Sequence, residues 1–109
     1  MSVPVVAYLA LAAALFGIGA AGALIRRNGI TIFLSIELML NSVNLAILAL
    51  GRSAADRAGD LAVALEGQVL VLFVLAVAAA EAAVGLALFI AVYRNRRTID
   101  INRLNLLRW

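Results

Sequence analysis

Three long apolar stretches, each with at most one charged residue, constrain this chain more than any other feature. The first, residues 1–25, carries no charge. The second, residues 28–51, carries only Glu37, and the third, in residues 67–93, carries only Glu81. A helix that spans a bilayer needs about 20 mostly apolar residues. The sequence therefore predicts an all-α protein with three transmembrane helices. These helices are expected near residues 3–25, 29–50 and 66–93.

The composition indicates that lipid is the solvent. The chain has 109 residues, of which 66% are hydrophobic, whereas soluble domains average about 45–50%. A domain of this size leaves much of its surface exposed, so it cannot hide that much apolar surface from water. We expect a single membrane domain over residues 1–109, with an outer loop over 51–65 and a cytoplasmic tail over 94–109.

The arginines predict the orientation, because cytoplasmic segments carry an excess of positive residues. With three spans, the first connection and the C-terminal tail lie on one side of the membrane. Seven arginines belong to that side: Arg26, Arg27, Arg94, Arg96, Arg97, Arg103 and Arg108. The other connection has Arg52 and Arg57, balanced by three acidic residues. The N-terminus is therefore expected outside and the C-terminus in the cytoplasm.

The residue types that are absent exclude several functions. The chain has no cysteine and no histidine, which removes thiol redox chemistry, Cys/His metal sites and histidine acid–base catalysis. The usual ligands of haem and iron–sulfur clusters are missing as well. All nine basic residues are arginines. They flank apolar stretches instead of forming a basic face, so nucleic-acid binding is not expected.

The two isolated glutamates are predicted to lie near the middle of the membrane. Glu37 follows Arg27 by ten residues, which is about 15 Å along a helix. Glu81 precedes Arg94 by thirteen residues, or about 20 Å. Since the hydrocarbon core is about 30 Å thick, both acids should lie at similar depth on adjacent antiparallel helices.

A carboxylate at that depth is unfavourable, and the cost indicates a function. A charged acidic residue at mid-helix costs roughly 2.5–3.5 kcal/mol on insertion scales. A carboxyl group can bind a proton and give it up again, so an acid kept at that depth despite the cost is suited to proton transfer. The sequence therefore predicts a proton relay at Glu37 and Glu81. The alternative is a pair of protonated acids that only hydrogen-bond between helices.

Two polar stripes run along the second predicted helix. Glu37, Asn41 and Asn44 share one face at helical spacing, where the amides can order water or donate to the carboxylate. The other stripe comprises Thr31, Ser35 and Ser42. Such hydroxyls can bond back to carbonyls of their own helix, so this stripe is predicted to be structural.

Small residues suggest where helices approach closely, as they do in lipid. In the first predicted helix one face carries Ala10, Ala14, Gly17 and Ala21, and we expect it to pack within the chain or against neighbours. Around Glu81 several alanines and Gly85 are expected to leave room for a partner helix or for water.

The stretches RRNGITIFLSIELMLNSVNLAILAL and EGQVLVLFVLAVAAAEAAVGLALFIAVYRNR, with NLLR in the tail, resemble a known family. This is the K-subunit family of bacterial NADH–quinone oxidoreductase, or respiratory complex I, equivalent to the mitochondrial 4L subunit. The resemblance implies that Glu37 and Glu81 match two intramembrane glutamates of the axis that couples quinone reduction to proton pumping. It also implies that Arg26 and Arg27 match paired arginines linked to activity, although these residues serve equally as topology markers.

The resemblance further implies a subunit between the quinone-proximal and antiporter-like subunits, in the inner membrane of a bacterial cell. It implies that no cofactor is bound by this chain, and that NADH, flavin, iron–sulfur clusters and quinone belong to other subunits of the enzyme. Two features depart from the family pattern. The connection over 51–65 looks longer than usual, and Glu66 stands where many members have aspartate.

Three other functions are compatible with parts of this pattern. The C subunit of a multisubunit cation/proton antiporter shares the three-helix plan and is the main alternative. A small multidrug transporter has a similar length, but it has four helices with the acid in the first. A purely structural packing subunit would not need Glu37 or Glu81.

Overall fold

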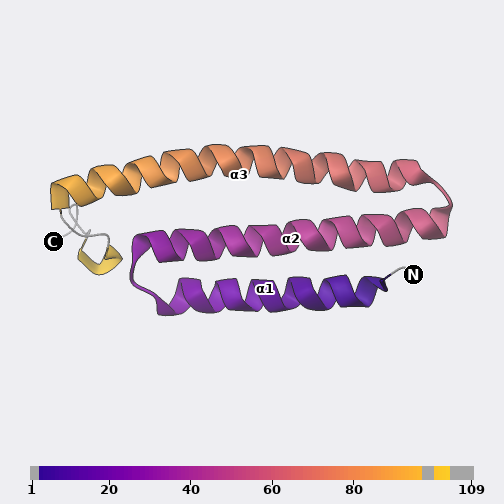
Figure 1. The fold of residues 1–109 in the computed structure, drawn as a ribbon, viewed down its shortest axis with the longest axis horizontal. Helices are drawn as coiled ribbons and strands as arrows, with labels where there is room; N and C mark the ends of the chain where they lie inside the picture. Colours follow the sequence, from indigo (N-terminus) through magenta and orange to yellow (C-terminus); the bar gives the residue numbers. More distant parts are fainter. Residues whose placement is uncertain (1–2, 97–99, 104–109) are drawn as a thin grey trace.

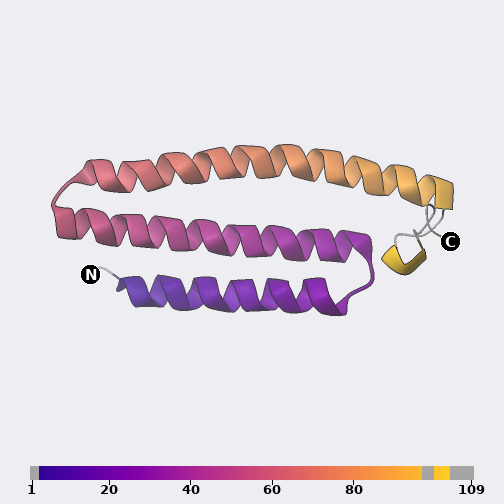
Figure 2. The same cartoon turned by 180° about the vertical axis from the view of Figure 1, so that it is seen from behind.

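A computed structural model describes residues 3–96 and 100–103 of the chain. Within these residues three long helices are followed by one turn of 3-10 helix. The elements are α1 Val5–Ile25, α2 Gly29–Ala58, α3 Leu61–Arg96 and η1 Ile101–Arg103. The three α-helices lie side by side, with α2 between α1 and α3 and adjacent helices antiparallel (Figures 1 and 2). All three are long and apolar enough to cross a membrane, which confirms the predicted fold class.

The connection between α1 and α2 is short because a side chain caps the second helix. Asn28 accepts hydrogen bonds through its Oδ1 from the backbone N–H groups of Ile30 at 2.9 Å and Thr31 at 3.1 Å. These two donors have no partner inside the helix, so the asparagine satisfies them and fixes the start of α2. The chain therefore reverses within a few residues after α1.

The prediction of an outer loop over residues 51–65 is wrong. Helix α2 continues to Ala58 and α3 begins at Leu61, so the connection is a tight turn. Gly59 at this turn has φ 66°, and its N–H donates to the Ala55 carbonyl at 2.8 Å. Asp60 then accepts from the backbone N–H of Ala62 at 3.0 Å. The loss of hydrophobicity after residue 50 ends the apolar stretch but not the helix, because alanine, arginine and leucine keep their helix propensity in water.

The lengths of the three helices can be compared with the thickness of the hydrocarbon core of a bilayer. Helix α1 has 21 residues and is about 31 Å long, close to the hydrocarbon thickness of about 30 Å. Helix α2 has 30 residues and α3 has 36, or about 45 and 54 Å. The paired ends of α2 and α3 therefore extend beyond the hydrocarbon core.

Glycines set the spacing between α1 and α2. A β-carbon on Gly19 would lie 2.7 Å from the Ser35 carbonyl oxygen, and one on Gly22 would overlap the Ser35 side chain. The face of α1 that meets α2 therefore includes buried Ala12 and Gly19. The face expected to pack is instead exposed in this chain: Ala10, Ala14, Gly17 and Ala21. The prediction that this face packs within the chain is therefore wrong, and packing against neighbouring subunits stays a prediction.

Helices α2 and α3 are also close at glycines. A β-carbon on Gly51 would lie 3.9 Å from Cα of Gly67. Nearer the other end, Phe33 covers Gly85, and its ring meets that of Phe89 edge to face at 6.0 Å. Most large apolar side chains outside these contacts are exposed, as expected of helices that face lipid or other subunits.

Candidate functional site

Glu37 and Glu81 lie at the same level of two adjacent helices. Phe33 and Gly85 are in contact, and each is four residues from the glutamate on its own helix. On the other side, the contact of Gly51 with Gly67 is fourteen residues from each glutamate. Because α2 and α3 are antiparallel, both contacts give one register, in which residue 37 is level with residue 81. The sequence-based expectation of similar depth agrees with this register.

The two glutamates differ in their surroundings. Glu37 is half-buried on α2, whereas Glu81 is exposed on α3. Glu81 lines an open groove whose other lining residues are apolar: Leu40, Phe73, Val74, Val77 and Ala78. Glu37 is not among the residues that line this groove. One carboxyl group thus lies on an apolar groove, and the other is partly enclosed by its own chain.

The space expected next to Glu81 is partly filled by the chain itself. A β-carbon on Gly85 would lie 2.9 Å from Cε2 of Phe33, so this glycine accommodates an aromatic ring of α2. The groove with Leu40 and Phe73 is the open space instead. Phe33 and Phe73 could not be identified from the sequence, because an aromatic residue in an apolar stretch gives no signal of which glycine or carboxyl group it will meet.

Asn44 is the most enclosed polar group on the glutamate face of α2. Only 6% of its surface is exposed, and its Oδ1 is buried without a hydrogen-bond partner among the described residues. A buried acceptor without a partner is unfavourable by about 1–3 kcal/mol. Asn41, the other amide of the predicted stripe, is exposed. The structure therefore separates the two asparagines, and only Asn44 is enclosed.

The second polar stripe behaves as a structural feature. Ser35 donates to the Thr31 carbonyl at 2.8 Å, and Ser42 donates to the Met39 carbonyl at 2.6 Å. Ser42 is nearly fully buried, with 1% of its surface exposed. Both hydroxyls are thus satisfied within α2, which confirms the prediction for these two residues.

Arg26 and Arg27 lie in the connection between α1 and α2, and both are exposed. The Arg27 carbonyl accepts a hydrogen bond from the N–H of Ile101 at 3.2 Å, and Asn28 forms an isolated β-bridge with Asp100. The segment after α3 is therefore attached to the loop that carries the two arginines, at the same end of the bundle (Figure 1). The prediction that the first connection and the residues after α3 share one side is confirmed for these residues.

Comparison with known proteins decides the family. A family described as NADH-ubiquinone/plastoquinone oxidoreductase chain 4L matches residues 7–109. The chain belongs to this family. It is 50% identical to NADH-quinone oxidoreductase subunit K 2 of Geotalea uraniireducens over 94% of both chains. It is also 50% identical to the 4L subunit of NAD(P)H-quinone oxidoreductase from the chromatophore of Paulinella chromatophora, over the full length of both. Subunit K of Salinibacter ruber is 52% identical over 91% of this chain and 90% of that one.

As a chain 4L family member, the protein is a multi-pass membrane subunit of an NADH-quinone oxidoreductase, and its partners are other subunits of that complex. The expected resemblance to the K-subunit family is thereby confirmed. Within residues 3–96 and 100–103, no group of three or more acidic, histidine or cysteine side chains could hold a metal ion.

Proposed function

We propose that Glu37 and Glu81 relay protons within a proton-pumping NADH-quinone oxidoreductase. The observation that supports this proposal is that the only two charged side chains of the long apolar stretches lie at one level of adjacent helices. Intramembrane ionisable residues are costly and usually mark ion or proton paths. A pair at matched depth can pass a proton between two helices through water or through a neighbouring subunit.

The relay would work through changes of charge outside this chain. Quinone reduction on neighbouring subunits would change the local field, and the field would favour uptake or release of a proton at each carboxyl group. Asn44 would hold a water by its buried oxygen, since a polar atom without a protein partner is where internal water binds. Asn41, which is exposed, would face a neighbouring subunit. Arg26 and Arg27 would support the activity of the complex from the cytoplasmic end of the bundle.

The remaining parts of the enzyme would come from other subunits. Antiporter-like and quinone-proximal subunits would cover the two sides of the bundle, and NADH, flavin, iron–sulfur clusters and quinone would bind there. The chain would lie in the inner membrane of a bacterial cell, with its N-terminus outside, because the arginine-rich end belongs in the cytoplasm.

Substitution of each acid in the assembled complex tests the proposal. We expect Glu37→Gln or Glu81→Gln to lower proton pumping in membrane vesicles by at least about tenfold, since a positioned acid–base group contributes that much or more. NADH:quinone activity should fall in parallel. Glu66→Gln is the matched control, because Glu66 is an exposed acid of α3 outside the third apolar stretch. Normal pumping and activity in both intramembrane variants would show that the acids only hydrogen-bond.

A further inference from the structure

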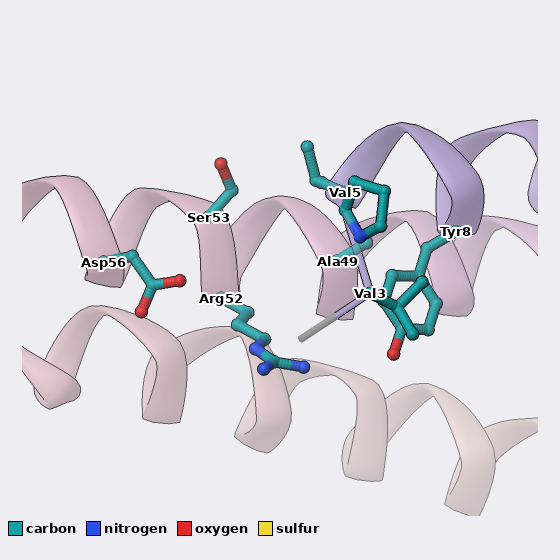
Figure 3. Close-up of a pocket in the computed structure, with 8 residues that line it drawn as sticks. Val3, Val5, Tyr8, Ala49, Arg52, Ser53 and Asp56 are labelled. Carbon is teal, nitrogen blue, oxygen red and sulfur yellow. The ribbon is translucent and has the colours of Figure 1, made fainter. Parts of the chain in front are cut away.

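A hollow with charged and apolar sides lies at the end of the bundle where α1 begins. Its walls come from the residues around the start of α1, including Val3, Pro4 and Tyr8, and from the last turns of α2, including Arg52 and Asp56 (Figure 3). It is separate from the groove at Glu81 and shares no lining residue with it. The proton relay proposed above makes no use of it.

The two charged residues of the hollow are available to a ligand. Arg52 and Asp56 are four residues apart on α2 and extend from the same side of the helix (Figure 3). Both are exposed, and neither forms a hydrogen bond or ion pair with another residue that the structure describes. The nearby Arg57 differs, because its guanidinium donates to Ser53 at 3.0 Å. The Arg52 guanidinium and the Asp56 carboxylate are therefore both available to form hydrogen bonds with a ligand.

The hollow lies at the height of the lipid headgroups. Helix α1 is about as long as the hydrocarbon core is thick, so Val5 at its start marks the boundary of the core. Arg52 and Asp56 line the same hollow as Val5, so they lie at this boundary, where the polar headgroup region begins. Tyr8, half-buried beside this boundary, is of a residue type enriched at the membrane interface.

We propose that this hollow binds the headgroup of a phospholipid that carries both a phosphate and a primary ammonium, as phosphatidylethanolamine does. Arg52 would bind the phosphate, since a guanidinium matches the geometry of phosphate oxygens. Asp56 would accept hydrogen bonds from the ammonium. Side chains four residues apart on a helix have β-carbons about 5–6 Å from each other, a spacing suited to two charges joined by a two-carbon chain.

The apolar wall and the acid define the lipid class. Val5 and Tyr8, on the bilayer side of the hollow, offer a surface for the glycerol and the first methylene groups of the acyl chains. Asp56 disfavours a purely anionic headgroup such as that of phosphatidylglycerol, because no ammonium would offset its charge. The hollow therefore favours a headgroup that carries both a phosphate for Arg52 and an ammonium for Asp56 over one that carries a phosphate alone.

Photo-crosslinking in the assembled complex tests this assignment. The complex is placed in nanodiscs with a photoactivatable phosphatidylethanolamine or phosphatidylglycerol, irradiated, and this subunit is mapped by mass spectrometry. We expect phosphatidylethanolamine to label the peptides that contain residues 3–8 and 49–56. Arg52→Gln should lower this labelling at least fivefold, whereas Arg52→Lys, which keeps the charge but loses the paired N–H donors, should lower it less than Arg52→Gln does.

Two further variants separate the contributions. Asp56→Asn should reduce the preference for phosphatidylethanolamine over phosphatidylglycerol at least threefold, and Arg57→Gln should leave labelling unchanged. Absence of labelling in the unmodified complex, or equal labelling in Arg52→Gln, would overturn the proposal. If the Arg52 variants instead lower the amount of this subunit in the complex and the unmodified complex is not labelled, a neighbouring protein fills the hollow and the proposal fails.

Discussion

Phe33 of α2 covers Gly85 of α3, and this contact lies one helical turn from each of the two intramembrane glutamates. A β-carbon on Gly85 would lie 2.9 Å from Cε2 of the phenylalanine ring and 3.2 Å from its Cζ. The same ring meets Phe89 edge to face. The contact fixes how close α2 and α3 come at the level of the carboxyl groups, so it also fixes the geometry in which a proton could pass between them.

Gly85→Ala should therefore destabilise the pairing of α2 and α3. Overpacking in a filled contact costs about 1–3 kcal/mol. Because the Phe33 ring can move aside, we expect the loss in the free energy of unfolding to lie at the low end of this range. Phe33→Leu should remove most of this loss, because the smaller side chain vacates the space beside Gly85. A double-mutant cycle on the free energy of unfolding in bicelles measures the coupling. Equal losses with and without Phe33 would show that the ring does not meet Gly85.

The register of α2 against α3 can be tested by a disulfide. Gly51→Cys with Gly67→Cys should crosslink readily, because a β-carbon on either glycine lies 3.9 Å from Cα of the other and disulfides join β-carbons about 3.5–4.5 Å apart. Trypsin cleaves after Arg52 and Arg57, between the two positions, so only a disulfide keeps the fragments together. The chain has no cysteine of its own.

The matched control moves one cysteine by a single residue. Gly51→Cys with Gln68→Cys should crosslink poorly, because one step rotates a side chain by about 100° around a helix and Gln68 is exposed. Efficient crosslinking of the control and little of the first pair would mean a different register. The two glutamates would then not be level.

Gly19→Ala should separate α1 from α2. The new methyl group would meet the Ser35 carbonyl oxygen and the Met39 side chain, and the carbonyl is backbone that cannot turn away. We expect a loss of about 1–3 kcal/mol in the free energy of unfolding, measured by pulse proteolysis in bicelles. Gly17→Ala is the matched control, since apart from the neighbouring backbone of α1 itself nothing lies within 4 Å of its β-carbon position. That variant should be neutral or gain up to about 1 kcal/mol from helix propensity.

Asn44→Leu should separate stability from proton transfer. Replacement removes a buried oxygen that lacks a partner among the described residues, so the free energy of unfolding should stay constant or rise by about 1 kcal/mol. Proton pumping in vesicles should fall several-fold if the oxygen holds a water of the relay. Ser42→Ala is the control, because Ser42 is buried two residues away but bonds to its own helix. Unchanged pumping in Asn44→Leu would assign the asparagine a packing role alone.

The sequence by itself determined the three spans and the matched level of the two glutamates on adjacent helices. Both follow from counting, because length along a helix is proportional to residue number and lipid admits few charged residues. The placement of Arg27 and the residues after α3 at one end of the bundle also follows, since three spans leave no other arrangement; the hydrogen bond that joins them does not. The self-satisfied hydroxyls of Ser35 and Ser42 were predictable for a related reason, because their acceptors belong to the same helix.

Only the tertiary structure decided which faces meet. Helices α1 and α3 are apolar on nearly every side, so no amphipathic stripe indicates their buried faces as it does in a soluble protein. The face of α1 with Gly19 contacts α2, and the face with Gly17 stays open. The Phe33 ring of α2 fills the space at Gly85, and Asn44 becomes enclosed while Asn41 does not. Each outcome depends on the shape of a neighbouring helix, and close packing between two helices is a property of the pair that neither sequence segment contains alone.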